Sequence, residues 1–326
     1  MKIRNKEFDM KSPDVYIMGI LNITPDSFSD GGRYVERDDI LRHAEEMIRA
    51  GADIIDIGGE STRPGYQPVT EQEETERVCN AIEVIRESFD IPISVDTYKA
   101  AVMDECLRAG ADIANDIWGL RFDLYNDQNS FGIRNKDEKL TEDIYISSQM
   151  AEVVKKYDVP VVVMHNDNMT RSLEERRASD MDIIKKYAQV CDMSVEEAKA
   201  DAEEANVISR VIRGLEQSID IARLYGIDKD KIILDPGVGF AKTDLENRKV
   251  LKALSRIVEE FDYTVLLGAS RKSVIGNALQ LPADEREEGT LVTTILAAEA
   301  GCKFVRVHDV EKNARALKMY RAIYEA

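Results

Sequence analysis

Short apolar runs alternate with longer segments of helical pattern along almost the whole chain. Eight of these runs are almost continuously apolar, which is typical of strands buried on both faces of a parallel sheet. They are Val15–Leu21, Ile54–Gly58, Ile93–Asp96, Ile113–Ile117, Val161–Met164, Ile232–Asp235, Val265–Gly268 and Phe304–Val307. The segments between and after them predict helices over Asp38–Ala50, Thr70–Ser88, Ala100–Ala109, Ser147–Tyr157, Val207–Tyr225, Glu246–Phe261, Thr290–Ala300 and Val310–Tyr324. Eight strand–helix units favour an α/β fold of the closed (β/α)8 type, a TIM barrel, over an open doubly wound sheet.

A weak internal repeat supports this count of units. Ala50-Gly51-Ala52-Asp53-Ile54 and Ala109-Gly110-Ala111-Asp112-Ile113 each end a helix with glycine and begin a strand, and residues 300–304 are similar. Glycine is expected just after a helix because it adopts the left-handed conformation without steric cost. We therefore predict a single domain over residues 1–326, with long loops after strands one and two.

Two polar stretches interrupt the rhythm, after strands four and five. Residues 121–142 predict a loop insertion, and residues 169–206 predict a heavily charged helical insertion. Within the second, Ser194-Val195-Glu196-Glu197 has the form of a capping box, so a helix is expected to begin near Val195. We interpret both insertions as solvated elaborations of the barrel.

Composition narrows the class of protein. The chain is 44% hydrophobic and 33% charged, as expected for a soluble globular protein, and no apolar run approaches the roughly 18 residues of a membrane span. The N-terminus lacks the apolar core of a signal peptide, which predicts a cytoplasmic location. A formal net charge of −18 argues against nucleic acid as a partner, because phosphate neutralisation needs a basic face.

Polar side chains stand at or just after the carboxyl end of each predicted strand. In a closed parallel barrel these ends meet at one mouth, where binding and catalytic residues of such barrels lie. A polar group there is costly unless it is hydrogen-bonded, so eight such ends together indicate a binding site. In strand order the residues are Asn22, the run 58–65, Asp96 with Thr97, Asn115 with Asp116, His165 with Asn166, Asp235, the run 270–273, and Arg306 with His308 and Asp309.

Four of these side chains suit a flat heterocycle. Asp96, Asn115 and Asp235 offer acceptors and an amide, and a carboxylate can accept two parallel hydrogen bonds from an aminopyrimidinone edge. Lys272 can donate a hydrogen bond to an exocyclic carbonyl. These residue types therefore indicate a site for a nitrogen heterocycle.

A second group of side chains suits phosphate. Arg63, Arg306 and His308 would converge over the mouth, where planar guanidinium groups bind phosphate oxygens. Asn22 offers an oxygen suited to Mg²⁺, which usually keeps several waters and bridges a diphosphate. The loop after strand one holds a single aromatic residue, Phe28, among small polar residues, and such a loop could close over a flat ligand.

Other chemistries lack their motifs in this chain. No Gly-x-Gly-x-x-Gly follows the first strand, and no Gly-x-x-x-x-Gly-Lys-Ser/Thr occurs, which weakens nucleotide-binding alternatives. No Gly-x-Ser-x-Gly occurs and only three histidines are present, so a nucleophilic triad is not supported.

Taken together, these motifs resemble those of the dihydropteroate synthases, the folate-pathway members of the pterin-binding barrels. The resemblance covers most of the chain, and it implies condensation of 6-hydroxymethyl-7,8-dihydropterin diphosphate with p-aminobenzoate, releasing diphosphate. The motifs are Met18–Gly32, Ala50–Gly65 with Gly-Gly-Glu-Ser-Thr-Arg-Pro-Gly, Ser94–Thr97, Asn115-Asp116, Leu234–Phe240, Ser270–Gly276 and Arg306–Val310.

The same resemblance implies roles for individual residues. The pterin would be bound by Asp96, Asn115, Asp235 and Lys272. Diphosphate would be bound by Asn22, Arg63, Arg306 and His308, with Mg²⁺ as cofactor at Asn22. The p-aminobenzoate would be framed by Phe28, Thr62, Pro64, Phe240 and Ser273. The residues expected to act in catalysis are Arg63, Lys272, Asp96, Arg306 and His308, in an enzyme that is usually a homodimer.

Two other functions stay open at this point. A methyltetrahydrofolate-binding barrel that passes a methyl group to a corrinoid protein would share the pterin contacts but has no use for the anion-binding set. A non-catalytic pterin-binding protein could use the charged insertion as a partner surface. The chain also departs from the usual synthase pattern at Tyr98, at Ala241, where glycine is common, and in the run 166–169.

Overall fold

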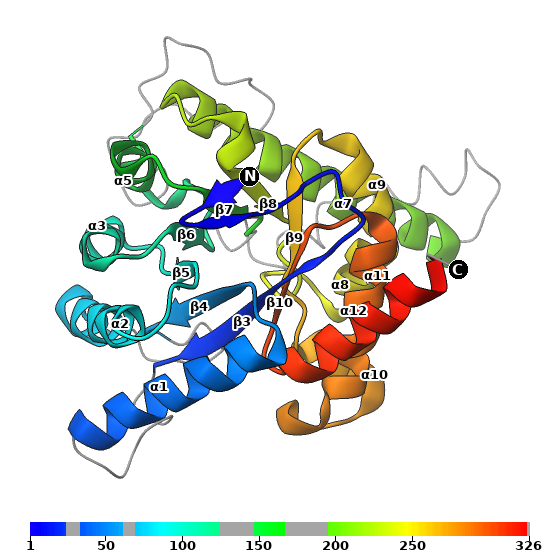
Figure 1. The fold of residues 1–326 in the computed structure, drawn as a ribbon. Helices are drawn as coiled ribbons and strands as arrows, with labels where there is room; N and C mark the ends of the chain where they lie inside the picture. The colour runs from blue at the N-terminus through cyan, green and yellow to red at the C-terminus, as the bar shows by residue number, and fades with distance from the viewer. Residues whose placement is uncertain (24–32, 61–68, 124–146, 167–194, 325–326) are drawn as a thin grey trace.

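A closed barrel of eight parallel strands forms the centre of the molecule, with helices around it (Figure 1). The computed structural model describes residues 1–23, 33–60, 69–123, 147–166 and 195–324. The barrel strands, in chain order, are β3 (Tyr16–Asn22), β4 (Ile54–Gly58), β5 (Ile93–Asp96), β6 (Ile113–Asp116), β7 (Val161–Met164), β8 (Ile232–Asp235), β9 (Thr264–Leu267) and β10 (Phe304–Val307). The strand β10 pairs with both β9 and β3, which closes the barrel. The predicted (β/α)8 fold is confirmed, and each strand lies within one residue of its expected bounds.

Helices follow the strands, as the sequence pattern predicts, with one further helix after β9, over Ser273–Leu279, that the pattern did not predict. They are α1 (Arg33–Ala50), α2 (Glu71–Arg86), α3 (Ala100–Ala109), α5 (Gln149–Tyr157), α7 (Val195–Leu224), α8 (Asp244–Lys252), α9 (Leu254–Glu260), α10 (Ser273–Leu279), α11 (Glu287–Ala300) and α12 (Val310–Tyr324), with short 3-10 turns at Lys229–Lys231 and Ala283–Glu285. The helix α7 begins at Val195, as the capping box predicts. None of the described helices is long and apolar enough to span a membrane.

One predicted helix is wrong. The segment expected as a single helix over Glu246–Phe261 forms two helices, α8 and α9, which meet at Ala253. Ala253 has φ −94° and ψ 13°, outside the helical region, so α8 ends before it and α9 begins after it. Leu254 and Ile257 are fully buried after this break, which gives packing of the core as the physical reason for it.

An N-terminal hairpin closes the end of the barrel where the strands begin. The sequence pattern did not predict this hairpin. Its strands, β1 (Lys2–Ile3) and β2 (Lys6–Glu7), are only two residues long and so carry no periodic signal. Ile3 and Phe8 are buried in a cluster with barrel residues that include Met18, Ile54 and Phe304. The hairpin and these side chains fill the amino end of the barrel, which leaves the carboxyl end as the only open mouth among the described residues.

The strand register places a layer of polar side chains next to this apolar layer, on the side toward the carboxyl ends of the strands. Side chains two residues apart on a strand face the same side, so Asp56 faces inward above Ile54, and Arg306 faces inward above Phe304. Asp56 is paired in register with Ser94, and Asp96 with Asn115. The inward residues near the carboxyl end are therefore charged or polar, while those below them are apolar.

The predicted insertions lie largely outside the described residues. Of residues 121–142, only Arg121–Asp123 are described, and of residues 169–206, only the part from Val195 onward, within α7. The single-domain boundaries and the solvated character of these stretches remain predictions.

Candidate active site

An ion-pair network lies at the centre of the barrel mouth. The Arg306 Nε atom is 2.6 Å from Asp56 Oδ2, and its Nη2 atom is 2.6 Å from Asp96 Oδ2. Asn115 Nδ2 donates to both oxygens of Asp56 at 3.3 Å. Because these side chains come from four different strands, the barrel register fixes their geometry. The result is a polar floor with two carboxylates, one amide and one guanidinium.

Asp56 is a site residue that the sequence analysis did not single out. Its side chain is fully buried, and it contacts both Arg306 and Asn115. The other polar residues of the mouth stand at strand ends, whereas Asp56 lies in the middle of β4. A signal was present, since a lone carboxylate in the apolar run Ile54–Gly58 must have a partner inside the fold.

Asp235 and Lys272 face this floor from β8 and from the loop after β9. Asp235 is 5% exposed, and its Oδ1 atom accepts the backbone N–H of Gly237 at 2.8 Å. Lys272 Nζ donates to the carbonyl oxygen of Val238 and lies 4.6 Å from the centre of the Phe240 ring. Two of the four residues predicted for the pterin, Asp235 and Lys272, therefore lie near Phe240, one of the five predicted for p-aminobenzoate.

The loop after β8 holds its shape through close backbone packing. Gly237 has φ +68°, and a Cβ atom there would lie 1.8 Å from the carbonyl oxygen of His165, so only glycine fits. Lys242 Nζ donates to the Gly237 carbonyl at 2.8 Å. Ala241 has φ +47°, which explains why glycine is common at this position: the left-handed conformation costs a residue with a Cβ atom roughly 1–2 kcal/mol.

Burial shifts the pKa values of the charged groups in the mouth. Burial raises the pKa of Asp96 to about 6, although Arg306 opposes the shift. Burial likewise raises the pKa of Asp235 and lowers that of Lys272 to about 8. Burial also acts to lower the pKa of Arg306, but Asp56 and Asp96 raise it well above its usual value. The guanidinium therefore stays charged, while Asp96 and Lys272 titrate near neutrality.

These pKa values predict a bell-shaped pH dependence for binding of a pterin. Asp96 must be ionised to accept hydrogen bonds, so affinity should fall as the pH drops below about 6. Lys272 must be protonated to donate to a carbonyl, so affinity should also fall as the pH rises above about 8. Titration of a pterin from pH 5 to 9 by calorimetry checks this, and a flat profile across that range would contradict the assignment.

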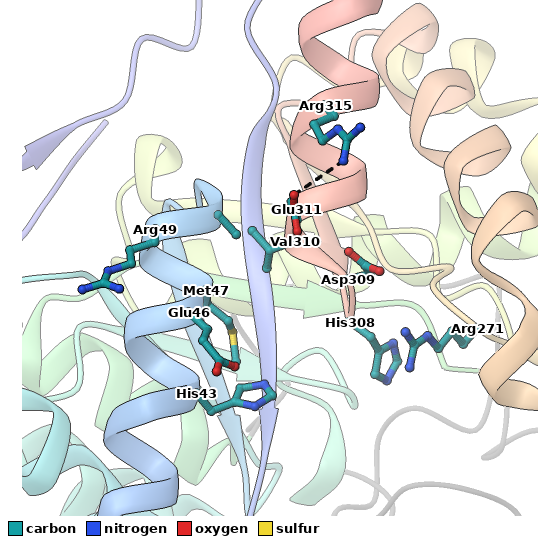
Figure 2. Close-up of a pocket in the computed structure, with 11 residues that line it drawn as sticks. His43, Glu46, Met47, Arg49, Arg271, His308, Asp309, Val310, Glu311 and Arg315 are labelled. Carbon is teal, nitrogen blue, oxygen red and sulfur yellow. Dashed lines mark hydrogen bonds and ion pairs between the residues drawn. The ribbon is translucent and has the colours of Figure 1, made fainter.

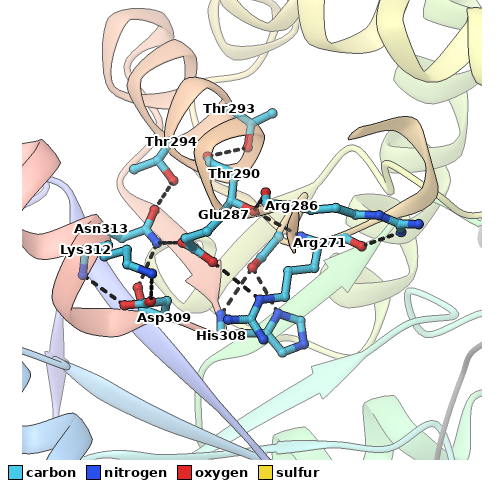
Figure 3. Close-up of polar contacts among 11 residues, drawn as sticks. Arg271, Arg286, Glu287, Thr290, Thr293, Thr294, His308, Asp309, Lys312 and Asn313 are labelled. Carbon is cyan, nitrogen blue, oxygen red and sulfur yellow. Dashed lines mark hydrogen bonds and ion pairs between the residues drawn. The ribbon is translucent and has the colours of Figure 1, made fainter. Parts of the chain in front are cut away.

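His308 and Arg271 form a second cluster at the edge of the mouth (Figure 3). The Ser270 Oγ atom is 2.9 Å from His308 Nδ1 and accepts the His308 backbone N–H at 3.2 Å. The backbone N–H of Arg271 donates to Thr290 Oγ1 at 3.1 Å, and the Arg271 carbonyl accepts from Arg286 Nη1 at 2.9 Å. Residues at the start of α11 thus hold the loop after β9 in place. Within that loop Arg271 has the left-handed backbone conformation, with φ +56°.

Arg271 and His308 also line a cleft of about 720 Å³ between α1 and α12 (Figure 2). Its other walls include His43 of α1, Asp309 just before α12, and Arg315 of α12. The sequence analysis gave His43 no role, and the structure places it in this wall. The cleft adjoins the cluster predicted to bind diphosphate.

The remaining predicted residues are placed as follows. Asn22 is half-buried at the end of β3, with its side chain facing Gly58 of β4. Ser273 is exposed at the first position of α10. Phe28, Thr62, Arg63 and Pro64 lie outside the described residues, so their roles remain predictions.

Comparison with known proteins decides the family. The model of the family "Pterin binding enzyme" matches residues 18–308. A dihydropteroate synthase of Clostridium beijerinckii is 44% identical over 320 residues, which cover 98% of this chain and 97% of that protein. The chain belongs to the dihydropteroate synthase family. It is therefore an enzyme of folate biosynthesis and a transferase, as the sequence motifs predict.

Solved structures of this family agree with the fold. A Clostridium difficile dihydropteroate synthase, solved in the presence of pteroic acid, has a TM-score of 0.75 and 40% identity, covering 98% of this chain and 100% of that one. A Xanthomonas albilineans dihydropteroate synthase with 4-aminobenzoic acid has a TM-score of 0.74 and 32% identity, covering 96% and 94%. Near full-length similarity to synthases favours this function over the methyltransferase and the non-catalytic alternatives.

Proposed function

We propose that the barrel mouth binds 6-hydroxymethyl-7,8-dihydropterin diphosphate and condenses it with p-aminobenzoate through the residues named above. The observation that carries this proposal is the polar floor with Asp96 and Asn115, faced by the buried carboxylate of Asp235 and by Lys272. A pterin is flat and has N–H donors along one edge and a carbonyl oxygen. Carboxylates can accept the donors and an ammonium can donate to the carbonyl, so the floor complements both.

The ligands of two relatives support this assignment. The Clostridium difficile protein was solved with pteroic acid and the Xanthomonas albilineans protein with 4-aminobenzoic acid. In this chain we assign the p-aminobenzoate position to the edge of the floor at Phe240 and Ser273, together with the predicted residues Phe28, Thr62 and Pro64. The Phe240 ring beside Lys272 gives this position an apolar wall.

Diphosphate is assigned to the other edge of the floor. Arg306 uses Nε and Nη2 for Asp56 and Asp96, which leaves N–H groups of the guanidinium for a phosphate oxygen. His308 is oriented by Ser270, and Arg271 lies beside it in the same cleft. Arg63 is predicted to complete this set. In a chain with a net charge of −18, such local cations are what capture an anion.

Asn22 fits the protein side of a magnesium site. Within the described residues no group of three or more His, Cys, Asp or Glu side chains could hold a metal ion. Mg²⁺ is commonly bound through one or two protein oxygens together with substrate phosphates, so a single amide oxygen at the mouth is compatible with it. When bound, Mg²⁺ would offset the negative charge that develops on the departing diphosphate.

We propose a dissociative mechanism for the chemical step. The bond between the pterin methylene carbon and the diphosphate oxygen breaks, and diphosphate leaves with the electron pair. Arg306, His308 and Arg63 stabilise the leaving group, while the floor holds the electron-rich pterin that carries the positive charge. The neutral arylamine nitrogen then attacks the methylene carbon and loses a proton to solvent. No strong base is needed, so positioning and electrostatics account for most of the catalysis.

One assay tests the proposed function. The protein is supplied with pterin diphosphate and Mg²⁺, and diphosphate release is followed with and without p-aminobenzoate. We expect release to depend on the amine and dihydropteroate to form in equal amount. Pterin binding without turnover would favour the non-catalytic alternative.

We further propose that the enzyme is a homodimer through α11 and α12. These helices lie side by side on the outside of the barrel (Figure 1) and expose large apolar side chains. Val292 and Leu296 of α11 are 60% and 37% exposed, and Met319 and Ile323 of α12 are 61% and 59% exposed. Within each pair the residues are four apart, so they share one helix face.

The dimer predicts a specific sensitivity to charge. Met319→Glu should give a monomer at micromolar concentration, because a carboxylate would be buried unpaired at the interface. Light scattering after size exclusion measures this. Leu245→Glu on α8, where the leucine is 42% exposed, is the matched control and should leave the mass unchanged. Equal masses for the two variants and the unchanged protein would contradict an interface at α12.

A further inference from the structure

A buried lysine joins three elements beside the mouth. Lys99, in the loop after β5, donates from Nζ to Glu60 Oε2 at 2.7 Å, to Glu74 Oε2 at 2.7 Å and to the carbonyl oxygen of Val69 at 2.9 Å. The side chains of Lys99, Glu60 and Glu74 are 10%, 4% and 1% exposed. An ammonium has three N–H groups, and here all three are used.

The same contacts tie together both ends of one segment. Glu60 Oε2 accepts the backbone N–H of Val69 at 3.1 Å, while Lys99 binds the carbonyl oxygen of the same residue. Glu60 and Val69 are the described residues on either side of residues 61–68. That segment carries Thr62, Arg63 and Pro64 of the predicted site. The separation of its two ends is therefore set by side-chain bonds, and Lys99 is at their centre.

Stability alone does not account for this cluster. Two buried carboxylates around one ammonium lose their hydration, and apolar residues of similar size commonly stabilise a protein at least as well. What buried charges supply is geometry, since their bonds hold only at defined distances. Burial acts to lower the pKa of Lys99, but its bonds to Glu60 and Glu74 raise it, so the ammonium stays charged.

The position of the cluster in the fold connects it to the pterin floor. Lys99 follows Asp96 by three residues, so the loop that begins at the floor carries the lysine. Glu74 lies in the first turn of α2, the helix that follows residues 61–68. The cluster thus links the strand that contacts the pterin to both ends of the segment predicted to contact the other substrate and diphosphate.

We propose that Lys99 is a positioning residue for this reaction, which holds the ends of residues 61–68 in register with the pterin-binding strand through Glu60, Val69 and Glu74. This inference rests on the proposed function of the site. Lys99 contacts no substrate in this role and acts through the residues that it ties together.

The charge-matched variant K99M/E74Q tests the proposal. The cluster of two carboxylates and one ammonium keeps its net charge of −1, because one positive and one negative charge are removed together. We expect kcat/KM for p-aminobenzoate to fall about 100-fold, the effect of a misplacement of about 1 Å at a reacting group. The Kd for a pterin should change less than about threefold, because Asp96, Asn115, Asp235 and Lys272 are untouched.

The control variant R86M/D112N removes a comparable ion pair at the opposite end of the barrel. Arg86 and Asp112 are bonded to each other and are 12% and 14% exposed. It should lower the thermal midpoint by a similar amount but leave kcat/KM within about threefold. If the two double variants lose activity in proportion to their thermal midpoints, the role of Lys99 is merely structural and the proposal fails.

A second measurement is independent of turnover. The Val69 amide is bonded to Glu60, so its hydrogen exchange should be slow in the unchanged protein and much faster in K99M/E74Q. If the unchanged protein binds pterin but does not turn over, the proposed function fails. Exchange at Val69 would still report whether Lys99 holds the ends of residues 61–68. If exchange at Val69 is unchanged in the variant, Lys99 does not hold the ends of residues 61–68 and the proposal fails.

Should the double variant not fold, Lys99→Arg gives the same test. We expect about a tenfold loss of kcat/KM for p-aminobenzoate, because a planar guanidinium cannot reach the same three acceptors.

Discussion

Replacing Asp235 by asparagine is expected to lower the affinity for a pterin at least about 100-fold. The carboxylate is buried, and its Oδ1 atom already accepts the Gly237 N–H, which fixes its orientation toward the mouth. An asparagine has one acceptor oxygen and would present an N–H₂ group to the donors of the pterin. Hydrogen bonds to charged groups contribute about 1.5–3 kcal/mol each, so the loss of two accounts for a change of this size.

Calorimetry with a pterin measures the effect, and Asp116→Asn is the matched control. Asp116 is also a fully buried carboxylate at a strand end, but it accepts the N–H groups of Trp118 and Leu120 in its own turn. The control variant should lose stability and keep its affinity for the pterin. If Asp235→Asn binds a pterin as tightly as the control does, the pterin is not bound by the β8 carboxylate.

Replacing Arg306 by methionine is expected to destabilise the fold by about 3–5 kcal/mol and to remove detectable turnover. Its guanidinium is paired with Asp56 and Asp96 at 2.6 Å each, and removing one partner of a buried pair leaves the other charge without compensation. Turnover falls further because the same guanidinium is assigned to the departing diphosphate. Urea unfolding and diphosphate release measure the two effects separately.

The pH dependence of this destabilisation has a definite sign. The pKa of Asp96 is already raised to about 6, above its value of 3.8 in an unfolded chain, so its ionised form weakens the fold. Loss of Arg306 raises that pKa further, and the stability deficit should therefore grow as the pH rises through about 6.

A second substitution, Asp56→Asn, added to Arg306→Met should restore much of the lost stability but none of the lost turnover. Recovery of turnover in that double variant would contradict the assignment of Arg306 to diphosphate.

Much of the fold follows from local patterns in the sequence. The eight strands could be predicted because strands buried on both faces are continuously apolar, and the helix at Val195 because its capping box is local. The break at Ala253 was missed, because no residue there interrupts a helix and the cause is packing of Leu254 and Ile257. The hairpin at Lys2–Glu7 was missed because its strands are too short to show a period.

The residues of the candidate site likewise divide into those that the sequence predicts and those that it does not. Asp96, Asn115, Asp235 and Lys272 could be found because a barrel brings strand ends together, and the structure places them around one floor. Asp56 was missed because it lies within a strand and not at its end. The loop geometry at Ala241 follows from a φ of +47°, which no sequence pattern states.

The sequence by itself determined the barrel, the family and most of the residues at the mouth, because periodicity and motifs are properties of neighbouring positions. Only the tertiary structure decided which of those residues are bonded to one another. Arg306 pairs with carboxylates 210 and 250 positions away, and Lys99 with carboxylates 25 and 39 positions away. Such partners are set by strand register and helix packing across the barrel, and the charge state of each buried group depends on them.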